Sequence, residues 1–238
     1  MPKGAMMTDQ RWNRFCTRGY LMPSPCRLLS FAPLGHVSER QLFWLVAFYG
    51  GMYGFYSGDM TTLNDDFREL NPTYVSAPPR IFNAVYAEYK EVVEEAVRER
   101  GSSERWRIEL EKLDLFRGVF GNSLQFLVTG SAPTSEVVKE FLRKCFGVPL
   151  YDGYGTTEAG GIATDGIISR DALVHLLDVP ELGYRSTDKP YPRGEICVHT
   201  DVMIDGYFKV FFFFVFVFVF FLMFFFSHHF ILESRQNF

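Results

Sequence analysis

The segment from residue 124 to residue 151 constrains the fold of this chain most strongly. It holds two short apolar runs, residues 124–128 and 148–151, and each run leads into a polar turn that contains glycine. Between the runs, apolar positions recur at helical spacing until Gly147, at Val137, Val138, Phe141, Leu142 and Cys145. A strand, a helix and a strand of these lengths predict a parallel β-α-β crossover. We therefore expect an α/β fold, in which ligands bind at the carboxyl ends of the strands.

Three further elements follow from local patterns. Ser38 and Gln41 have the spacing of a capping box, and the sequence after them predicts a short buried helix, with apolar positions at Leu42, Leu45, Val46 and Tyr49. After a proline pair, an apolar stripe over residues 81–96 predicts an amphipathic helix that ends at Gly101. Residues 195–199 alternate in polarity, which is typical of a strand.

Composition bears on the binding partners and on the cellular compartment of the chain. The chain has 238 residues and a formal net charge of -4, and its Lys and Arg are not clustered, so we expect no nucleic-acid partner. The four cysteines form no C-x-x-C pair and have no histidine at zinc-ligand spacing. This pattern predicts unreactive thiols in a reduced, intracellular compartment. Residues 1–12 lack the long apolar stretch of a secretory signal.

The string Tyr154-Gly155-Thr156-Thr157-Glu158 follows the second apolar run and carries most of the recognisable chemistry. Glycine lets a backbone approach phosphate, threonine hydroxyls can donate to phosphate oxygens, and tyrosine can stack on a base. Glutamate can hold a magnesium ion that offsets phosphate charge. We therefore interpret the string as part of a nucleotide site in a loop at a strand end. The alternative is a polar loop without a ligand, because short Gly/Thr strings often occur by chance.

Other active-site patterns are missing from the sequence. There is no G-x-S-x-G string, so we do not expect a serine hydrolase built from Ser131, His36 and Asp152. The pair His228-His229 has only Glu233 nearby, which indicates a chance pair rather than a metal site. The sequence has neither a Walker G-x-x-x-x-G-K-[ST] string nor a Rossmann G-x-G-x-x-G string.

Several short strings along residues 1–209 are more informative in their order than each is alone. They are P-K-G-A-M-M-T at 2–8, F-A-P-L-G-H at 31–36, S-A-P-P-R-I-F at 76–82, G-S-A-P at 130–133, D-G-Y-G-T-T-E at 152–158, G-E-I-C-V at 194–198 and G-Y-F-K at 206–209. In this order they resemble the adenylate-forming enzymes, the superfamily of AMP-dependent synthetases and ligases. The resemblance implies a fragment of the large N-terminal domain of such an enzyme.

The resemblance also implies roles for individual residues. Lys3 would belong to the end of the phosphate loop, and His36 would border the acyl pocket. Tyr154 would stack on adenine, Thr157 would meet the phosphate, and Glu158 would ligate Mg²⁺; the expected catalytic groups are therefore Lys3, Thr157 and Glu158. The remaining expected nucleotide-binding residues are Gly130, Ser131, Ala132 and Pro133 in the adenine-binding turn, and Asp152, Gly153, Gly155 and Thr156 in the signature loop.

The reaction implied is attack of a fatty carboxylate on the α-phosphate of ATP, which gives acyl-AMP and pyrophosphate. Mg²⁺ and Lys3 would offset phosphate charge in this step. Coenzyme A would then displace AMP, so the expected partners are a long-chain fatty acid, ATP and coenzyme A. Residues 31–82 resemble long-chain acyl-CoA synthetases, whereas residues 177–195 resemble the adenylation domain of carboxylic acid reductases. We favour the synthetase, and the reductase stays open as an alternative.

The resemblance stops at Lys209, before the family's T-G-D aspartate and its late catalytic lysine, and the glycines of the phosphate loop are not present before Lys3. We therefore expect a truncated form with little or no full turnover. The domains we expect are a partial adenylation domain over residues 1–209 and a Phe-rich tail over residues 210–238.

The run V-F-F-F-F-V-F-V-F-V-F-F-L-M-F-F-F at residues 210–226 has three interpretations. It is a short membrane span, a strand-prone aggregating segment, or translated non-coding sequence. With a genuine tail, the location would be a membrane such as the endoplasmic reticulum, and otherwise the cytoplasm. A membrane-tethered, inactive nucleotide- or acyl-binding remnant is the alternative from outside the enzymes.

Overall fold

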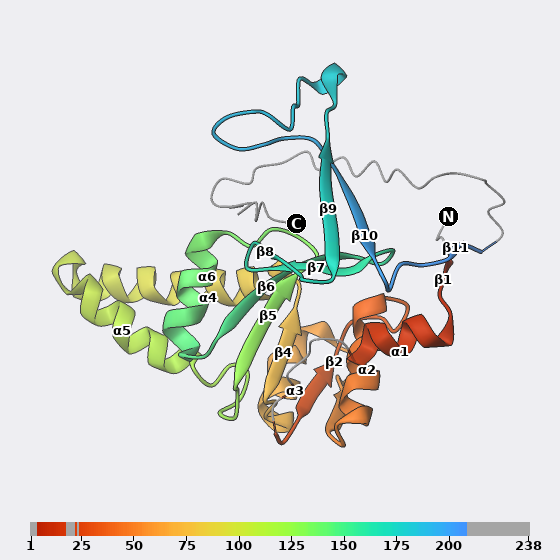
Figure 1. Cartoon of the computed structure of the whole chain (residues 1–238). Coiled ribbons are helices and arrows are strands. Elements are labelled where there is room, and N and C mark those ends of the chain that lie inside the picture. The colour runs from red at the N-terminus through yellow and green to blue at the C-terminus, as the bar shows by residue number, and fades with distance from the viewer. Residues whose placement is uncertain (1–3, 18–21, 23, 209–238) are drawn as a thin grey trace. The chain divides into compact units, whose positions relative to one another are not determined.

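The structure is a computed structural model, and it describes residues 4–17, 22 and 24–208 (Figure 1). Lys3, Lys209 and the run at residues 210–226 lie outside the described residues, and the expected boundary at residue 209 therefore stays a prediction. The chain divides into two compact units. We call Cys16–Asp152 the central unit, and Met1–Phe15 together with Gly153–Phe238 the terminal unit.

The central unit alternates helices with parallel strands. Its elements are β2 (Arg27–Ser30), α2 (Val37–Phe48), β3 (Met52–Phe55), η1 (Met60–Thr62), α3 (Leu63–Leu70), β4 (Tyr74–Ala77), α4 (Pro79–Arg100), η2 (Ser102–Glu104), α5 (Arg105–Phe116), β5 (Phe126–Gly130), α6 (Glu136–Phe146) and the start of β6 (Leu150–Thr156). Strand β2 pairs in parallel with β3, and β4 pairs in parallel with β5. The N–H of Leu127 in β5 donates to the carbonyl of Pro149 at 2.9 Å, which places the start of β6 beside β5.

The β-α-β crossover predicted from the sequence is confirmed as β5, α6 and β6. Helix α6 ends at Gly147, whose φ of 64° is the left-handed conformation that glycine adopts without steric cost. The stripe at residues 81–96 is also confirmed, because α4 ends at Arg100 and Gly101 follows it. Helices α4, α5 and α6 pack together in Figure 1.

Aromatic side chains fill the core of the central unit. Phe82 and Phe120 are fully buried, and Phe67 is 1% exposed. The Phe120 ring meets those of Phe67 and Phe82 edge to face, at centroid distances of 5.0 and 6.0 Å. Such contacts add to the free energy gained by burying apolar area. The four cysteines of the chain are free, so no disulfide supports this core.

The capping box expected at Ser38 is wrong. Helix α2 begins at Val37, so its N-cap residue is His36, and no side chain caps it. Ser38 lies inside the first turn, where its Oγ is 2.7 Å from Nδ1 of His36. The helix is also buried on one face only, because Leu42, Leu45 and Val46 are buried; the other face exposes Phe43, Trp44, Phe48 and Tyr49.

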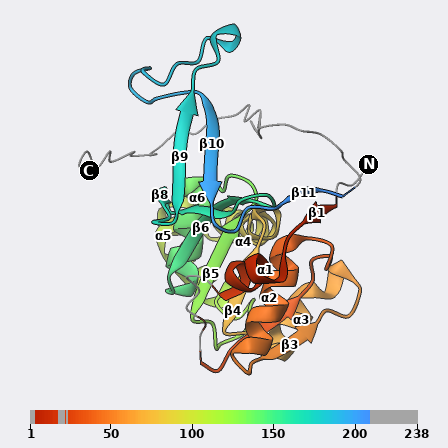
Figure 2. The same cartoon turned by 45° about the vertical axis from the view of Figure 1, so that its right-hand side comes forward.

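The terminal unit is built from antiparallel pairs. Its elements are β1 (Ala5–Met6), most of α1 (Asp9–Thr17), the end of β6, β7 (Gly160–Thr164), β8 (Ile167–Ile168), β9 (Ala172–Leu177), η3 (Pro180–Leu182), β10 (Glu195–Thr200) and β11 (Gly206–Tyr207). Strand β7 pairs with β6 and with β8, and β1 pairs with β11. Figure 2 shows β9 and β10 side by side. Strand β10 confirms the strand predicted at residues 195–199, and β9 was not predicted.

No helix within the described ranges has both the length and the hydropathy needed to cross a membrane.

Candidate functional site

The motif at residues 152–158 lies mostly in a strand, and the expectation of a loop is wrong there. Strand β6 continues through Thr156, and only residues 157–159 form the turn to β7. The register shifts between Tyr154 and Gly155, where β6 pairs with β7. A Cβ at Gly155 would lie 2.4 Å from the carbonyl oxygen of Gly160. Glycine is therefore needed here because two backbones come close together, whatever ligand the strand contacts.

Hydrogen bonds hold the turn at residues 157–159 from both sides. The Oγ1 of Thr156 accepts the N–H of Ala159 at 3.0 Å, and the hydroxyl of Thr200 donates to the Ala159 carbonyl at 2.8 Å. The N–H of Ile204 donates to the Glu158 carbonyl at 2.9 Å. Thr157 is exposed at the tip, and Glu158 is half-buried. The turn thus presents a hydroxyl and a carboxylate on a fixed backbone.

The carboxylate of Glu158 has a partner that the sequence analysis did not assign. The hydroxyl of Tyr207 in β11 donates to Oε1 of Glu158 at 2.5 Å. Burial, followed by the hydrogen bond to Glu158 and its charge, raises the pKa of Tyr207. Tyr207 therefore stays protonated as a donor at neutral pH. The G-Y-F-K string at residues 206–209 was the available signal, but the string by itself does not name a partner for its tyrosine.

Strand β11 also brings the N-terminal motif to this turn. The N–H of Phe208 donates to the Gly4 carbonyl, and the N–H of Asp205 donates to the Met6 carbonyl, both at 2.7 Å. The guanidinium of Arg11 donates to the Met203 carbonyl at 3.0 Å and forms an ion pair with Asp205. Three segments far apart in the sequence therefore meet in the terminal unit: β1, the turn at residues 157–159, and β11. Lys3 precedes β1 and lies outside the described residues.

Tyr154 lies in the same unit and is half-buried. It packs against a small core formed by Ala159, Ile162 and Ala172. Burial raises the pKa of its phenol. The ring is therefore fixed by apolar contacts, and its stacking on a base stays a prediction.

Asp152, the first residue of the motif, belongs to the central unit and forms an ion pair there. Its Oδ2 lies 2.8 Å from Nζ of Lys139 on α6. Burial would lower the pKa of the Lys139 ammonium, but the hydrogen bond and charge of Asp152, with the charge of Glu136, outweigh this effect and raise the pKa. The pair ties the start of the motif to the helix of the β-α-β crossover.

Strand β5 ends at Gly130, and residues 131–133 of the predicted turn follow it. Ser131 has a φ of 68°, a left-handed conformation that is rare outside glycine. Below it, the buried hydroxyls of Thr129 and Thr134 are 2.7 Å apart and brace the turn. Ser131, Ala132 and Pro133 are exposed. The turn is therefore rigid and open, as a ligand-binding turn requires, and its contact with adenine stays a prediction.

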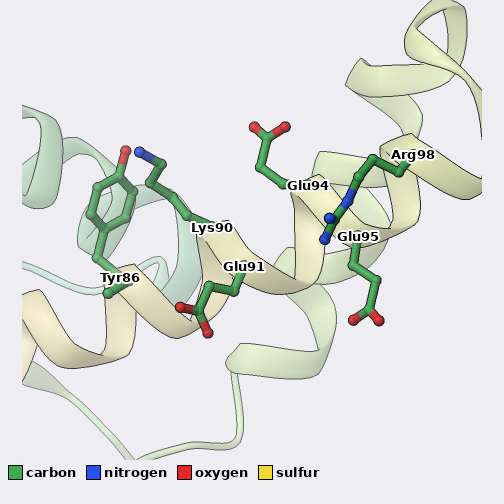
Figure 3. Close-up of a pocket in the computed structure, with 7 residues that line it drawn as sticks. Tyr86, Lys90, Glu91, Glu94, Glu95 and Arg98 are labelled. Atoms are coloured by element: carbon green, nitrogen blue, oxygen red, sulfur yellow. The ribbon is translucent and has the colours of Figure 1, made fainter.

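His36 lies at the start of α2 in the central unit and is exposed, with Ser38 as its hydrogen-bond partner. Its role beside an acyl group stays a prediction. An open hollow runs along one face of α4, lined by Tyr86, Ala87, Lys90, Glu91, Glu94, Glu95 and Arg98 (Figure 3). The hollow contains none of the motif residues, and we assign it no ligand.

The donor set for a metal ion is small. Among the described residues, no group of three or more His, Cys, Asp or Glu side chains is arranged to hold an ion. Mg²⁺ is usually held by one or two carboxylates together with water and substrate phosphates, so one half-buried glutamate on a fixed turn is compatible with it. Glu158 is the residue that fits this description.

The central unit contains a β-α-β crossover, and its last strand, β6, carries the motif into the turn at residues 157–159. The model of the AMP-binding enzyme family matches residues 1–208, and the chain belongs to this family. The α/β fold expected from the resemblance is confirmed. In a comparison with solved structures, the adenylation domain of a carboxylate reductase from Mycobacterium chelonae matches with a TM-score of 0.79 and 31% identity, over 87% of this chain and 33% of that chain.

Both groups that the sequence analysis left open have members among the relatives of this chain. The chain is 36% identical over 217 residues to a carboxylic acid reductase of Mycobacterium tuberculosis, covering 87% of this chain and 18% of the reductase. It is 33% identical over 213 residues to the peroxisomal long chain acyl-CoA synthetase 6 of Arabidopsis thaliana, covering 76% of this chain and 30% of the synthetase. The chain thus spans less than a third of either protein.

Proposed function

We propose that the chain takes part in ATP-dependent activation of a long-chain fatty acid to acyl-AMP, which coenzyme A then converts to acyl-CoA. The observation that carries this proposal is the meeting of β1, the turn at residues 157–159 and β11 in the terminal unit. All three segments carry strings that resemble motifs of the adenylate-forming enzymes, and the chain belongs to the AMP-binding enzyme family. A glutamate on a braced turn, beside an exposed threonine, offers a place for phosphate and a cation.

Each motif residue has a proposed task. Thr157 would donate to a phosphate oxygen, and Glu158 would hold Mg²⁺, which supplies positive charge where the phosphates repel an incoming carboxylate. Lys3 would add a second positive charge. Tyr154 would stack on adenine. The turn of Gly130, Ser131, Ala132 and Pro133 is proposed as an adenine-binding turn, and Asp152, Gly153, Gly155 and Thr156 as further nucleotide-binding residues. His36 would border the acyl group.

The adenylation domain of a carboxylic acid reductase is the second candidate, and a specific observation favours it. The Segniliparus rugosus reductase domain, solved in complex with AMP and a co-purified carboxylic acid, matches with a TM-score of 0.75 and 32% identity over 87% of this chain and 34% of that chain. Both candidates form an acyl-adenylate first and differ only in what accepts the acyl group. The exposed motif turn is compatible with either.

The test is pyrophosphate exchange by the purified 238-residue chain. With ATP, Mg²⁺ and palmitate, the proposal predicts palmitate-dependent incorporation of labelled pyrophosphate into ATP at a low rate, in keeping with the weak turnover expected of this chain. Glu158→Gln should lower the exchange rate on the order of 100-fold, because it removes a charge that acts on the phosphates. Glu181→Gln is the matched control, since Glu181 is an exposed glutamate of the same unit.

The acceptor is tested separately. Added coenzyme A should yield palmitoyl-CoA if the chain belongs with the synthetases. Adenylate formation without palmitoyl-CoA would favour the reductase candidate, because its adenylate requires a different thiol. Binding of ATP with no exchange under any condition would contradict both candidates and leave the binding remnant.

A further inference from the structure

We propose that Tyr207 is a positioning residue, which holds the carboxylate of Glu158 in the orientation in which it would ligate the cation of a bound nucleotide. The inference rests on the proposed function and adds to it a residue that acts through Glu158. Its basis is the 2.5 Å hydrogen bond from the Tyr207 hydroxyl to Oε1 of Glu158.

Hydrogen bonds hold both the backbone and the side chain of Glu158. A glutamate side chain has three rotatable bonds, so an exposed one samples many orientations, and ordering it opposes binding. In this chain one short segment fixes both ends of Glu158. The N–H of Ile204 holds its carbonyl at 2.9 Å, and Tyr207, three residues on, holds its carboxylate. The carboxylate is therefore ordered before any ligand arrives, which is the condition for tight metal coordination.

Tyr207 is itself held by the pairing of β11 with β1. Ala5 pairs with Tyr207 and Met6 with Gly206 in the β1–β11 ladder. The hydrogen bond from Phe208 to Gly4 continues this pairing beyond β11. The backbone of Tyr207 is thus fixed against the N-terminal motif, and its hydroxyl in turn holds the carboxylate of Glu158.

The donor to the Glu158 carboxylate is an uncharged hydroxyl. A phenol hydroxyl donates one hydrogen bond and carries no charge, so it orients Glu158 without placing a positive charge beside the carboxylate. A lysine or arginine at this place would neutralise it. The guanidinium of nearby Arg11 instead donates to Asp205 and to the carbonyl of Met203. Glu158 therefore accepts from an uncharged donor, whereas the positive charge of Arg11 pairs with Asp205.

A purely structural role for the same hydrogen bond is the alternative. In that case the bond fastens the turn to β11, and its loss changes stability without changing affinity for metal. The two roles differ in what Tyr207→Phe does, because phenylalanine keeps the ring and the backbone pairing and removes only the hydroxyl.

The experiment uses the full chain, ATP and Mn²⁺, with free Mn²⁺ measured by electron paramagnetic resonance. Tyr207→Phe should raise the Mn²⁺ dissociation constant in the presence of ATP by about ten-fold, the range expected for losing a partner of a metal ligand. Metal-free ATP binding and the melting temperature should stay near those of the unaltered chain. Tyr191→Phe, an exposed tyrosine of the same unit, is the matched control and should change nothing.

A second variant keeps the test sharp. In a Glu158→Gln background, Tyr207→Phe should have no further effect on Mn²⁺, because both act through one carboxylate. An unchanged Mn²⁺ affinity, or a lowered melting temperature alone, would overturn the inference and leave the proposed function intact. If the unaltered chain bound no ATP with or without metal, the proposed function would fail, and the inference that rests on it would fail too.

Discussion

The ammonium of Lys139 lies 2.8 Å from Oδ2 of Asp152, and both side chains are largely shielded, at 17% and 27% exposure. The pair links α6 to the first residue of the motif. Lys139→Met should therefore destabilise the chain by about 1–2 kcal/mol, more than a fully exposed ion pair contributes. Urea unfolding measures this difference, and Lys144→Met, an exposed lysine of the same helix, should have little effect.

The contribution of this pair should depend on pH in a defined direction. The pKa of Lys139 is raised above its ordinary value of 10.5, so the folded state binds the proton more tightly than the unfolded chain. The stabilisation is fully present below about pH 10 and is lost as pH rises through the higher folded-state pKa. The stability difference between the unaltered chain and Lys139→Met should therefore be constant near neutral pH and shrink in alkali. A difference that grew with alkaline pH would contradict the assignment.

Gly155 should tolerate no side chain, because its Cβ would meet the Gly160 carbonyl at 2.4 Å and the Gly161 Cα at 3.1 Å. Both are backbone atoms, which cannot move without disturbing the β6–β7 ladder. Gly155→Ala should cost about 2 kcal/mol or more of unfolding free energy. Gly161→Ala is the matched control on the facing strand, since a Cβ there meets nothing within 4 Å. Equal effects of the two substitutions would show that the close approach is not real.

The buried hydroxyl pair of Thr129 and Thr134 should show strong coupling. Replacing either threonine with valine leaves the other hydroxyl buried without its partner, which should cost about 1–3 kcal/mol. Replacing both removes the unsatisfied group, so the double variant should be more stable than the sum of the single effects predicts. Additive effects in urea unfolding would argue against the 2.7 Å contact.

Among the four cysteines, Cys197 should react first with a thiol reagent. Cys16, Cys26 and Cys145 are buried, whereas Cys197 is half-buried. Burial raises the pKa of Cys16 to about 11 and that of Cys145 to about 12, so neither forms much reactive thiolate at neutral pH. An aromatic disulfide reagent should modify Cys197 first, and faster as pH rises, with the other thiols reacting only on unfolding. Loss of the rapid phase in Cys197→Ser confirms the assignment, and a rapid phase that persists contradicts it.

Elements with clear apolar spacing could be predicted from the sequence, whereas a strand with a distant partner and the exact start of a helix could not. The β5-α6-β6 crossover and α4 were predictable because the apolar spacing lies within each element, and because Gly147 and Gly101 directly follow the two helices. Strand β9 was missed because its partner β10 follows only after a long connection. The start of α2 was misplaced because Ser38 has the right residue type for a cap, while His36 has the extended backbone of one.

The candidate site was predicted as a set of motifs and not as an arrangement. Gly155 was interpreted as freedom to approach a phosphate, whereas the approaching backbone is that of Gly160 in β7. The bond between Glu158 and Tyr207 joins residues 49 apart in the sequence, and no spacing rule connects them. Contacts of this kind arise from β1–β11 pairing, which two-residue strands do not reveal through periodicity.

The proposed activity requires that the chain bind an acyl-adenylate. Calorimetric titration of the 238-residue chain with the non-hydrolysable sulfamate analogue of palmitoyl-adenylate tests it most directly, with the guanosine counterpart as the control ligand. The account predicts saturable binding of one adenosine analogue per chain and much weaker binding of the guanosine analogue. No binding of the adenosine analogue, or equal binding of the two, would contradict it.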